Sequence, residues 1–329
     1  MVPCSHPLHR LEPLFPACDY ITGHRFEVAR CGGCGFIVTV PQPGADAMST
    51  YYPEGYYGTQ TANRFPAPVE WLQRRLYRRR AKWVQRFNLN RVGRVLDVGC
   101  GRGLLLREFQ RQGWEVQGTE LSEPAARYAV ATLKLPVQIG SLEQLHFPSE
   151  RFDAVVMWHV LEHVSDPRVI LAEVHRVLRP GGMFMVGVPN FGSPEARMCR
   201  NKWLHLDVPR HLTHFTHASL REALARAGFT VRDACSFSPE YDCFSFVQSL
   251  LNRLGVRHNL LLGLLRRKGA GVLREEHSGA LHLLATVLLS PLLGMLSVPV
   301  TTVAGLVGHG ATITLLAVKN DDGPDDTNK

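Results

Sequence analysis

Short apolar runs alternate with amphipathic stretches through the middle of the chain. The runs resemble buried strands, and the stretches between them place apolar residues at helical spacing. This alternation predicts a doubly wound α/β sheet. We expect strands at 95–98, 114–119, 137–140, 152–158, 183–188, 229–237 and 311–319, and helices at 69–87, 104–112 and 218–227.

A glycine-rich loop follows the first of these strands. The strand carries Asp97, the loop reads Gly99-Cys100-Gly101-Arg102-Gly103, and a helix pattern begins directly afterwards. Glycines let backbone pass close to a ligand, and the helix N-terminus that follows favours binding at the same place. Glu120 ends the second strand, where a carboxylate can accept hydrogen bonds from both ribose hydroxyls of a nucleoside. An ordinary strand–helix turn is the alternative for the loop taken alone.

The G-x-G-x-G spacing, with an acid two residues before the first glycine, resembles the first motif of class I S-adenosylmethionine-dependent methyltransferases. Segments 152–155 (FDAV), 161–164 (LEHV) and 178–182 (LRPGG) are similar to those of the small-molecule members, and they follow in the same order. The resemblance covers about 94–228 and implies a Rossmann-like, seven-stranded sheet with an antiparallel last strand. It implies S-adenosylmethionine as cofactor, held by Asp97, Gly99, Cys100, Gly101, Gly103, Glu120, Leu121, Ser141, Leu142, Trp158 and His159.

Four histidines are candidates to remove a proton from the methyl acceptor, because histidine can act as a base near neutral pH. His159 directly follows the fourth strand, and His163 lies four residues later. His211 and His214 lie in segment 203–215, which looks like the active-site covering segment of related small-molecule methyltransferases. We favour His163 or His211 as the base, with His214 and His159 as the other choices.

The same polar segment also allows a purely structural interpretation. Asp207 and Arg210 can form an ion pair, and Thr216 can cap the helix that follows. A metal-assisted mechanism that uses Glu162 and the histidines has no clear ligand spacing in the sequence.

The N-terminal region carries a possible zinc site. Cys31 and Cys34 are separated by two glycines between two strand-like runs, which is the spacing of half a tetrahedral zinc site. Many methyltransferases of this type resemble a zinc ribbon joined to a catalytic domain, which makes Cys4 the third expected ligand. The fourth ligand stays open among His6, His9 and Cys18, and the alternative is a hairpin with two buried thiols.

Basic residues are concentrated just before the first strand. Ten lysines and arginines stand against Glu70 alone between residues 64 and 94, within a chain of net charge +8. Most lie on the expected helix 69–87, which favours an anionic surface such as phospholipid head groups, nucleic acid or a phosphorylated substrate. A solvated charged face is the alternative.

An apolar stretch separates the last two strands. Segment 283–307 has 25 residues and no charge, which meets the length of a membrane span. A single crossing would leave the last strand on the wrong side of the membrane, and Pro291 and Pro299 should break a continuous helix. We therefore expect two short helices, either dipping into one leaflet of a membrane or packed as a cap or dimer surface.

Composition adds limits on location. No basic segment with an apolar core follows Met1, so we expect no secretory signal and a cytoplasmic or peripheral membrane location. Eight cysteines without an export signal favour thiols or metal ligands over disulfides. We divide the chain into a zinc-ribbon-like module (1–45), a tyrosine-rich linker and basic helix (46–90), a methyltransferase core (91–242), an apolar helical insert (243–310), a closing strand (311–319) and a disordered acidic tail (320–329).

These features predict a methyltransferase that acts by in-line displacement on a small or lipid-linked acceptor. We expect O-methylation of a saccharide or a quinone-like molecule. Two alternatives stay open: a ribosomal-RNA methyltransferase, against which the uncharged insert argues, and a non-catalytic binding or scaffold protein. S-adenosylmethionine is the expected cofactor and zinc a possible structural ion, while anionic membrane is a possible partner and nucleic acid a less favoured one.

Overall fold

The computed structural model describes residues 10–52, 67–87, 92–265 and 279–320. Its centre is a seven-stranded sheet, as the alternating pattern predicted. The strands lie in the order β10-β11-β8-β7-β4-β5-β6. Their bounds are β4 Arg94–Val98, β5 Glu115–Glu120, β6 Val137–Ile139, β7 Phe152–Trp158, β8 Leu178–Pro189, β10 Phe229–Cys235 and β11 Thr312–Lys319.

The direction of the strands confirms the expected topology. Neighbours from β6 through β5, β4 and β7 to β8 are parallel. β11 lies between β8 and β10 and is antiparallel to both. The parallel strands therefore end at one edge of the sheet, and that edge collects the residues that follow each strand. Segment 178–182 is part of β8, which begins five residues earlier than the expected strand 183–188.

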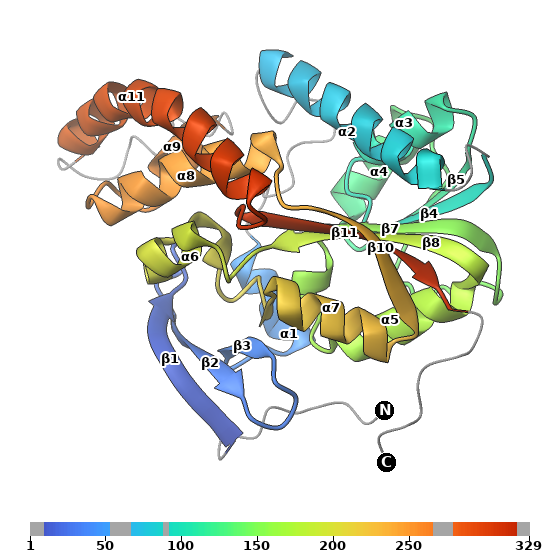
Figure 1. Ribbon diagram of the computed structural model, residues 1–329. Coiled ribbons are helices and arrows are strands. Elements are labelled where there is room, and N and C mark those ends of the chain that lie inside the picture. The colour runs from blue at the N-terminus through green and yellow to red at the C-terminus, as the bar shows by residue number, and fades with distance from the viewer. Residues whose placement is uncertain (1–9, 53–66, 88–91, 266–278, 321–329) are drawn as a thin grey trace.

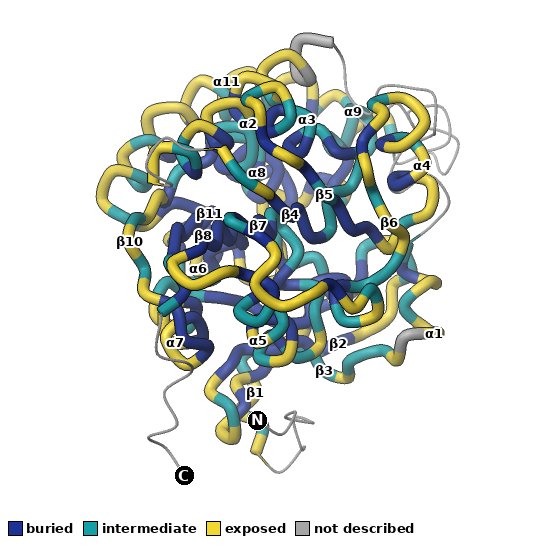
Figure 2. Tube along the Cα trace, turned by 90° about the vertical axis from the view of Figure 1, so that its right-hand side faces the viewer, coloured by how far each residue is buried: buried dark blue, intermediate teal, exposed yellow. Residues whose placement is uncertain are grey.

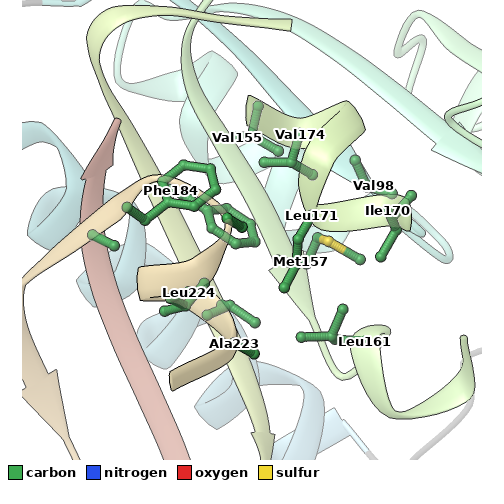
Figure 3. Close-up of a cluster of buried hydrophobic side chains, with 14 of the residues drawn as sticks. Val98, Val155, Met157, Leu161, Ile170, Leu171, Val174, Phe184, Ala223 and Leu224 are labelled. Atoms are coloured by element: carbon green, nitrogen blue, oxygen red, sulfur yellow. The ribbon is translucent and has the colours of Figure 1, made fainter. Parts of the chain in front are cut away.

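Helices cover both faces of this sheet, because alternate residues of each buried strand face opposite sides. α5 and α7 pack on one face, and α2, α3 and α4 lie on the other (Figure 1). On the first face, side chains of α5 and α7 contact Val155 and Met157 of β7 (Figure 3). Val156 of the same strand faces α2 and α3. The bounds are α2 Ala67–Phe87, α3 Leu104–Arg111, α4 Glu123–Ala131, α5 Pro167–Val177 and α7 His217–Arg226.

A second, four-stranded sheet lies beside the first, with the order β1-β2-β3-β9. Its first three strands come from the N-terminal region, whereas β9 comes from the polar segment after β8. Phe36 and Val38 of this region join the same hydrophobic cluster as Val98 of β4. The N-terminal strands therefore share both a sheet and a core with the larger sheet. Their bounds are β1 Leu11–Cys18, β2 Arg25–Cys31, β3 Ile37–Val40 and β9 Thr213–His214, followed after β3 by α1 Ala45–Met48.

Three helices stand between β10 and β11 in the described residues. α8 is Pro239–Arg253, α9 is Leu260–Leu265 and α11 is Gly279–Leu306. The expectation of two short helices was wrong, because α11 is continuous through Pro291 and Pro299. A proline removes one backbone hydrogen bond and its ring clashes with the carbonyl group four residues earlier, a local cost that tertiary packing can offset. Packing of α11 along α8 then holds the turns on either side of each proline in one helix.

Some predicted features lie outside the described residues. They are Cys4, His6 and His9, most of the tyrosine-rich linker and the acidic tail from 321 onward.

Candidate functional site

The glycine loop has the backbone conformation that its sequence predicted. Gly99, Gly101 and Gly103 all have positive φ, between 55° and 73°, which side chains other than glycine rarely adopt. A Cβ atom at Gly99 would collide with Val160, and one at Gly103 would collide with Leu135. A Cβ at Gly101 would meet nothing within 4 Å. Gly101 therefore borders open space, as a residue that cradles a ligand should.

Two buried carboxyl groups lie beneath this loop. The two Glu120 oxygens accept hydrogen bonds from the backbone nitrogens of Gly101 and Ser122, each at 2.7 Å. Burial raises the pKa of Glu120. Burial, followed by the charge of Glu120, raises the pKa of Asp97 to about 8. Each Glu120 oxygen keeps a further lone pair, so the carboxyl group fits the ribose-binding role predicted for it.

Other predicted cofactor residues surround the same sheet edge. Leu121 is 70% exposed directly after β5, and it offers apolar area for a flat aromatic base. Ile139, which the sequence reasoning missed, is exposed at the end of the neighbouring β6. Leu142 is fully buried in the core, so its side chain cannot line an open site. Ser141 accepts a hydrogen bond from the Gln144 backbone, and burial is the main cause that raises the pKa of the Cys100 thiol.

His159 and Glu162 form a hydrogen-bonded pair beyond the end of β7. His159 has a φ of 53°, an uncommon conformation for a residue with a side chain, and such residues cluster at functional sites. Its Nδ1 lies 3.1 Å from Glu162 Oε1. Since the carboxylate can only accept, Nδ1 carries the hydrogen and Nε2 keeps its lone pair. That Nε2 is buried and has no partner among the described residues.

Glu162 is the most strongly perturbed carboxylate of this group. Burial alone would raise its pKa, but the bond from His159 and the imidazoles of His163 and His211 outweigh burial and lower the pKa to about 2. Glu162 is therefore ionised at neutral pH while 1% exposed. Its second oxygen, Oε2, has no hydrogen-bond partner in the part of the chain described here.

The polar segment brings His211 to the same place. His163 and His211 lie edge to face, with ring centres 4.7 Å apart. His211 Nδ1 is 2.7 Å from the carbonyl oxygen of His205, and His163 Nδ1 is 2.9 Å from that of Arg210. Burial is the main cause that lowers the pKa of His211 to about 4, so this ring is neutral at pH 7. The two residues favoured from sequence are therefore neighbours in space, although 48 positions separate them in the chain.

His214 has a different environment. It belongs to β9, and its Nε2 lies 2.9 Å from the hydroxyl of Thr39. That hydroxyl donates to the His211 carbonyl oxygen, so it accepts from His214, whose Nε2 is then protonated. His214 is bonded within the four-stranded sheet and is a poorer candidate for a base.

The structural interpretation of Asp207, Arg210 and Thr216 is confirmed. Arg210 donates to Asp207 at 2.8 Å and to Asp19 at 2.7 Å. Thr216 caps α7 through a reciprocal pair of bonds with Ser219. The arginine ties the segment that carries His211 to the N-terminal sheet.

Sequence reasoning missed two residues that complete this site. Tyr241 of α8 packs on His159, with ring centres 4.2 Å apart. Arg80 of α2 lies 3.8 Å above the ring of Trp158 and forms a buried ion pair with Glu240. Local sequence patterns carry no signal for these contacts, because α2 and α8 are far apart in the chain. Arg80 and Ser238, which are hydrogen-bonded, are separated by 158 positions.

The predicted zinc ligands are only partly tested. Cys31 and Cys34 flank a tight turn at the end of β2. Cys18 pairs with Arg25 at the opposite end of the same hairpin, about 20 Å from Cys31 at the usual rise of a strand. The structure therefore excludes Cys18 as the fourth ligand, and the other choices lie outside the described residues.

Comparison with known proteins agrees with this geometry. The sequence profile of a methyltransferase domain family matches residues 71–234. Residues 71–234, just under half of the chain, are therefore similar to a methyltransferase domain. A probable S-adenosylmethionine-dependent methyltransferase from Mycolicibacterium smegmatis is 33% identical over 165 residues, which covers 48% of this chain and 60% of that protein.

A ubiquinone biosynthesis O-methyltransferase from Maricaulis maris is 30% identical over 167 residues, which covers 46% of this chain and 65% of that protein. The chain thus spans less than two thirds of these relatives. A solved S-adenosylmethionine-dependent methyltransferase from Mesorhizobium loti is 20% identical, covers 73% of this chain and 98% of its own, and gives a TM-score of 0.44. The fold assignment rests on strand order and direction.

Proposed function

We propose that the methyltransferase domain transfers a methyl group from S-adenosylmethionine to a hydroxyl oxygen of a small, lipid-linked acceptor. The observation that carries this proposal is the meeting of two sites at one sheet edge. The glycine loop with Glu120 follows β4 and β5, and the pair His159–Glu162 follows the adjacent β7.

The cofactor half of the site fits a nucleoside. Gly101 leaves open space, Glu120 can accept from ribose hydroxyls, and Leu121 with Ile139 offers apolar surface to a base. S-adenosylmethionine, when bound, supplies an electrophilic methyl group. These residues hold and orient it for in-line attack, which is the main requirement of a displacement reaction.

The proton-removing half of the site centres on His159 in this proposal. Glu162 holds the ring through Nδ1, and Nε2 keeps a lone pair that can accept the acceptor's hydroxyl proton. A base held in this way by a third group is the usual arrangement for activating a nucleophile. The hydroxyl proton would pass to Nε2 as the oxygen–methyl bond forms and the sulfur–methyl bond breaks, with the bonding electron pair left on the sulfur. This places His159 ahead of His163 and His211, the residues favoured from sequence.

The substitution His159→Asn tests this role. We expect kcat to fall about 10²–10⁴-fold, with the affinity for S-adenosylmethionine unchanged by calorimetry. The matched control His217→Asn, a half-buried histidine bonded to Ser236, should keep full activity. Equal turnover of the His159 variant and the wild type would refute the assignment. If the wild type itself does not bind S-adenosylmethionine, the proposed function is refuted.

Helix α11 supports a lipid-linked acceptor. It is long and apolar enough to span a membrane by length and composition, and 17% of its most apolar window is buried. Leu288 and Met295 are 64% and 70% exposed, whereas Ser297 is 2% exposed. The helix thus turns a polar residue inward and apolar ones outward, which is the reverse of a soluble helix. Figure 2 draws much of α11 as exposed.

The position of α11 favours a peripheral contact in place of a membrane crossing. It packs lengthwise on α8, with Leu289 and Leu293 against that helix. α2, which carries the exposed Arg74, Arg75 and Arg78, lies at the same side of the molecule in both views (Figures 1 and 2). An apolar surface beside a cationic one is the arrangement that binds anionic lipid. Through α8 the same segment reaches His159, so acceptor and membrane would be close together.

Sedimentation with phosphatidylglycerol vesicles tests the contact. We expect wild-type protein to pellet, and the triple variant Leu288→Ser, Leu292→Ser, Met295→Ser to stay in solution with its cofactor affinity intact. The control replaces the exposed Val130 and Val169 by serine, and these residues lie on α4 and α5. If wild type and triple variant sediment equally, the membrane proposal fails and soluble acceptors should be tried.

A structural zinc ion belongs to the proposal for the N-terminal sheet. Cys31 and Cys34 would be two ligands and Cys4 a third. We expect Cys34→Ser to lower the zinc content by about one ion per chain, measured by elemental analysis, and to make the hairpin β1–β2 less stable to proteolysis.

A further inference from the structure

Three potential ligand atoms converge beside the pair His159–Glu162. One nitrogen each from His163 and His211 and one oxygen of Glu162 lie within 4.8 Å of one another. Glu162 and His163 follow β7, whereas His211 comes from the segment between β8 and β9. No other group of three such residues has this spacing in the described part of the chain.

Hydrogen bonds around the cluster leave the right atoms free. The Nδ1 atoms of His163 and His211 both lie within hydrogen-bond distance of backbone carbonyl oxygens, at 2.9 Å and 2.7 Å. A carbonyl can only accept, so each Nδ1 is protonated and each Nε2 carries a lone pair. Metal-binding histidines are characteristically fixed in this way, with the non-ligating nitrogen bonded to a carbonyl or carboxylate.

Glu162 supplies the second observation that points to a ligand. Its Oε1 is occupied by His159. Its Oε2 has no hydrogen-bond partner among the described residues, and the side chain is only 2% exposed. A buried carboxylate oxygen without a partner is destabilising unless a donor or a cation satisfies it.

We propose that Glu162, His163 and His211 form a binding site for a divalent transition-metal ion. Two imidazoles and one carboxylate suit zinc and similar first-row ions better than magnesium or calcium, which prefer oxygen ligands. Three protein ligands leave at least one coordination position open. Zinc–nitrogen and zinc–oxygen distances are about 2.0–2.2 Å, so the three side chains would draw together around a bound ion.

The place of the ion suggests what it does, and this role rests on the proposed function. Glu162 would join the two parts, with Oε1 on His159 and Oε2 on the metal. The open position would hold an oxygen of the acceptor next to the His159 base. A bound cation also lowers the pKa of a hydroxyl that coordinates it, which would make the proton easier for His159 to remove.

Cobalt binding tests the site without using activity. Chelator-treated, full-length protein is titrated with Co²⁺, and the visible bands of nitrogen and oxygen ligands are followed separately from the near-ultraviolet bands of thiolate ligands. We expect wild type to bind one cobalt ion that shows the visible bands of nitrogen and oxygen ligands. His211→Asn should lower the affinity for that ion at least tenfold and leave any thiolate bands unchanged.

Matched variants keep the test decisive. His217→Asn should bind cobalt as wild type does, and Glu162→Gln should behave like His211→Asn. Circular dichroism and the affinity for S-adenosylmethionine identify a variant that fails to fold. If one of His211→Asn and Glu162→Gln fails to fold, the cobalt affinity of the other tests the site. The proposal is overturned if wild type shows no visible cobalt bands, or if His211→Asn keeps them at the same affinity. Neither outcome affects the His159 test or cofactor binding, so failure of the metal site is distinct from failure of the proposed function.

Discussion

At the scale of single residues, Gly101 and Glu120 form the centre of the proposed cofactor site. Glu120 accepts a hydrogen bond from the Gly101 backbone, so the carboxylate both fixes the loop and remains available to a ribose. Gly101 itself has φ of 55°, and a Cβ atom at this position would have no other atom within 4 Å. The positive φ favours glycine at this position, and the open space beside it is where we propose that the cofactor binds.

The substitution Gly101→Val should abolish detectable binding of S-adenosylmethionine. Its side chain would occupy the open space beside the loop, and its backbone conformation would be strained by about 1–2 kcal/mol. Gly181→Ala is the control, because Gly181 also has positive φ with open space but lies in the turn of β8. Titration calorimetry should show full binding for Gly181→Ala. If Gly101→Val binds S-adenosylmethionine normally, the glycine loop is not part of the cofactor site.

At the scale of elements, a buried ion pair joins the N-terminal sheet to the segment that carries His211. Arg210 and Asp19 both have fully buried side chains, and Arg210 also donates to the carbonyl oxygen of Tyr51 at 2.8 Å. One arginine therefore fixes three pieces of chain around the proposed metal site. Its contribution depends on all partners being present, because an unpaired buried charge is costly.

Asp19→Asn should lower the free energy of unfolding by about 3–5 kcal/mol, since it leaves Arg210 with one fewer anionic partner in the interior. Urea denaturation measures the change. Glu222→Gln breaks the exposed pair Glu222–Arg226 and should change stability by less than about 1 kcal/mol. If the two substitutions cost the same, the N-terminal sheet is not held to the domain in this way.

At the scale of the whole molecule, several buried histidines make stability depend on pH. Burial, followed by the charge of His211, lowers the pKa of His214 to about 3. Burial, followed by the charge of Lys202, lowers the pKa of His258 to about 4. An unfolded histidine titrates near 6.5, so the unfolded chain binds more protons than the folded one below that pH. The folded state is therefore favoured above pH 6.5 and loses stability as the pH falls toward 4.

Each of these histidines should lower the free energy of unfolding by up to about 1.4 kcal/mol per pH unit between pH 6.5 and 4. Thermal or urea denaturation at several pH values measures the slope. The ring of His258 stacks on Tyr20. His258→Gln removes one titrating group and should reduce the slope by up to about 1.4 kcal/mol per pH unit. An unchanged slope in that variant would show that His258 has the same pKa in the folded and the unfolded chain.

Sequence alone could predict the parts of this protein that are written in short, local patterns. The strands of the large sheet, the glycine loop and the acid at Glu120 each depend on residues within about ten positions. Every expected strand is present, although β8 begins at Leu178 and β10 ends at Cys235, and Glu120 ends β5 as expected. Local hydrophobic periodicity and backbone sterics fix such features before any long-range contact forms.

Tertiary structure decided everything that depends on contacts between distant segments. The sequence could not show that His211 meets Glu162, that Tyr241 covers His159, or that β9 joins the N-terminal strands. It also predicted a break at the prolines of α11, where packing on α8 maintains one helix. The physical reason is the same in each case: burial and hydrogen-bond partners are properties of the folded chain, and they set which histidine keeps a free lone pair and which carboxylate oxygen lacks a partner.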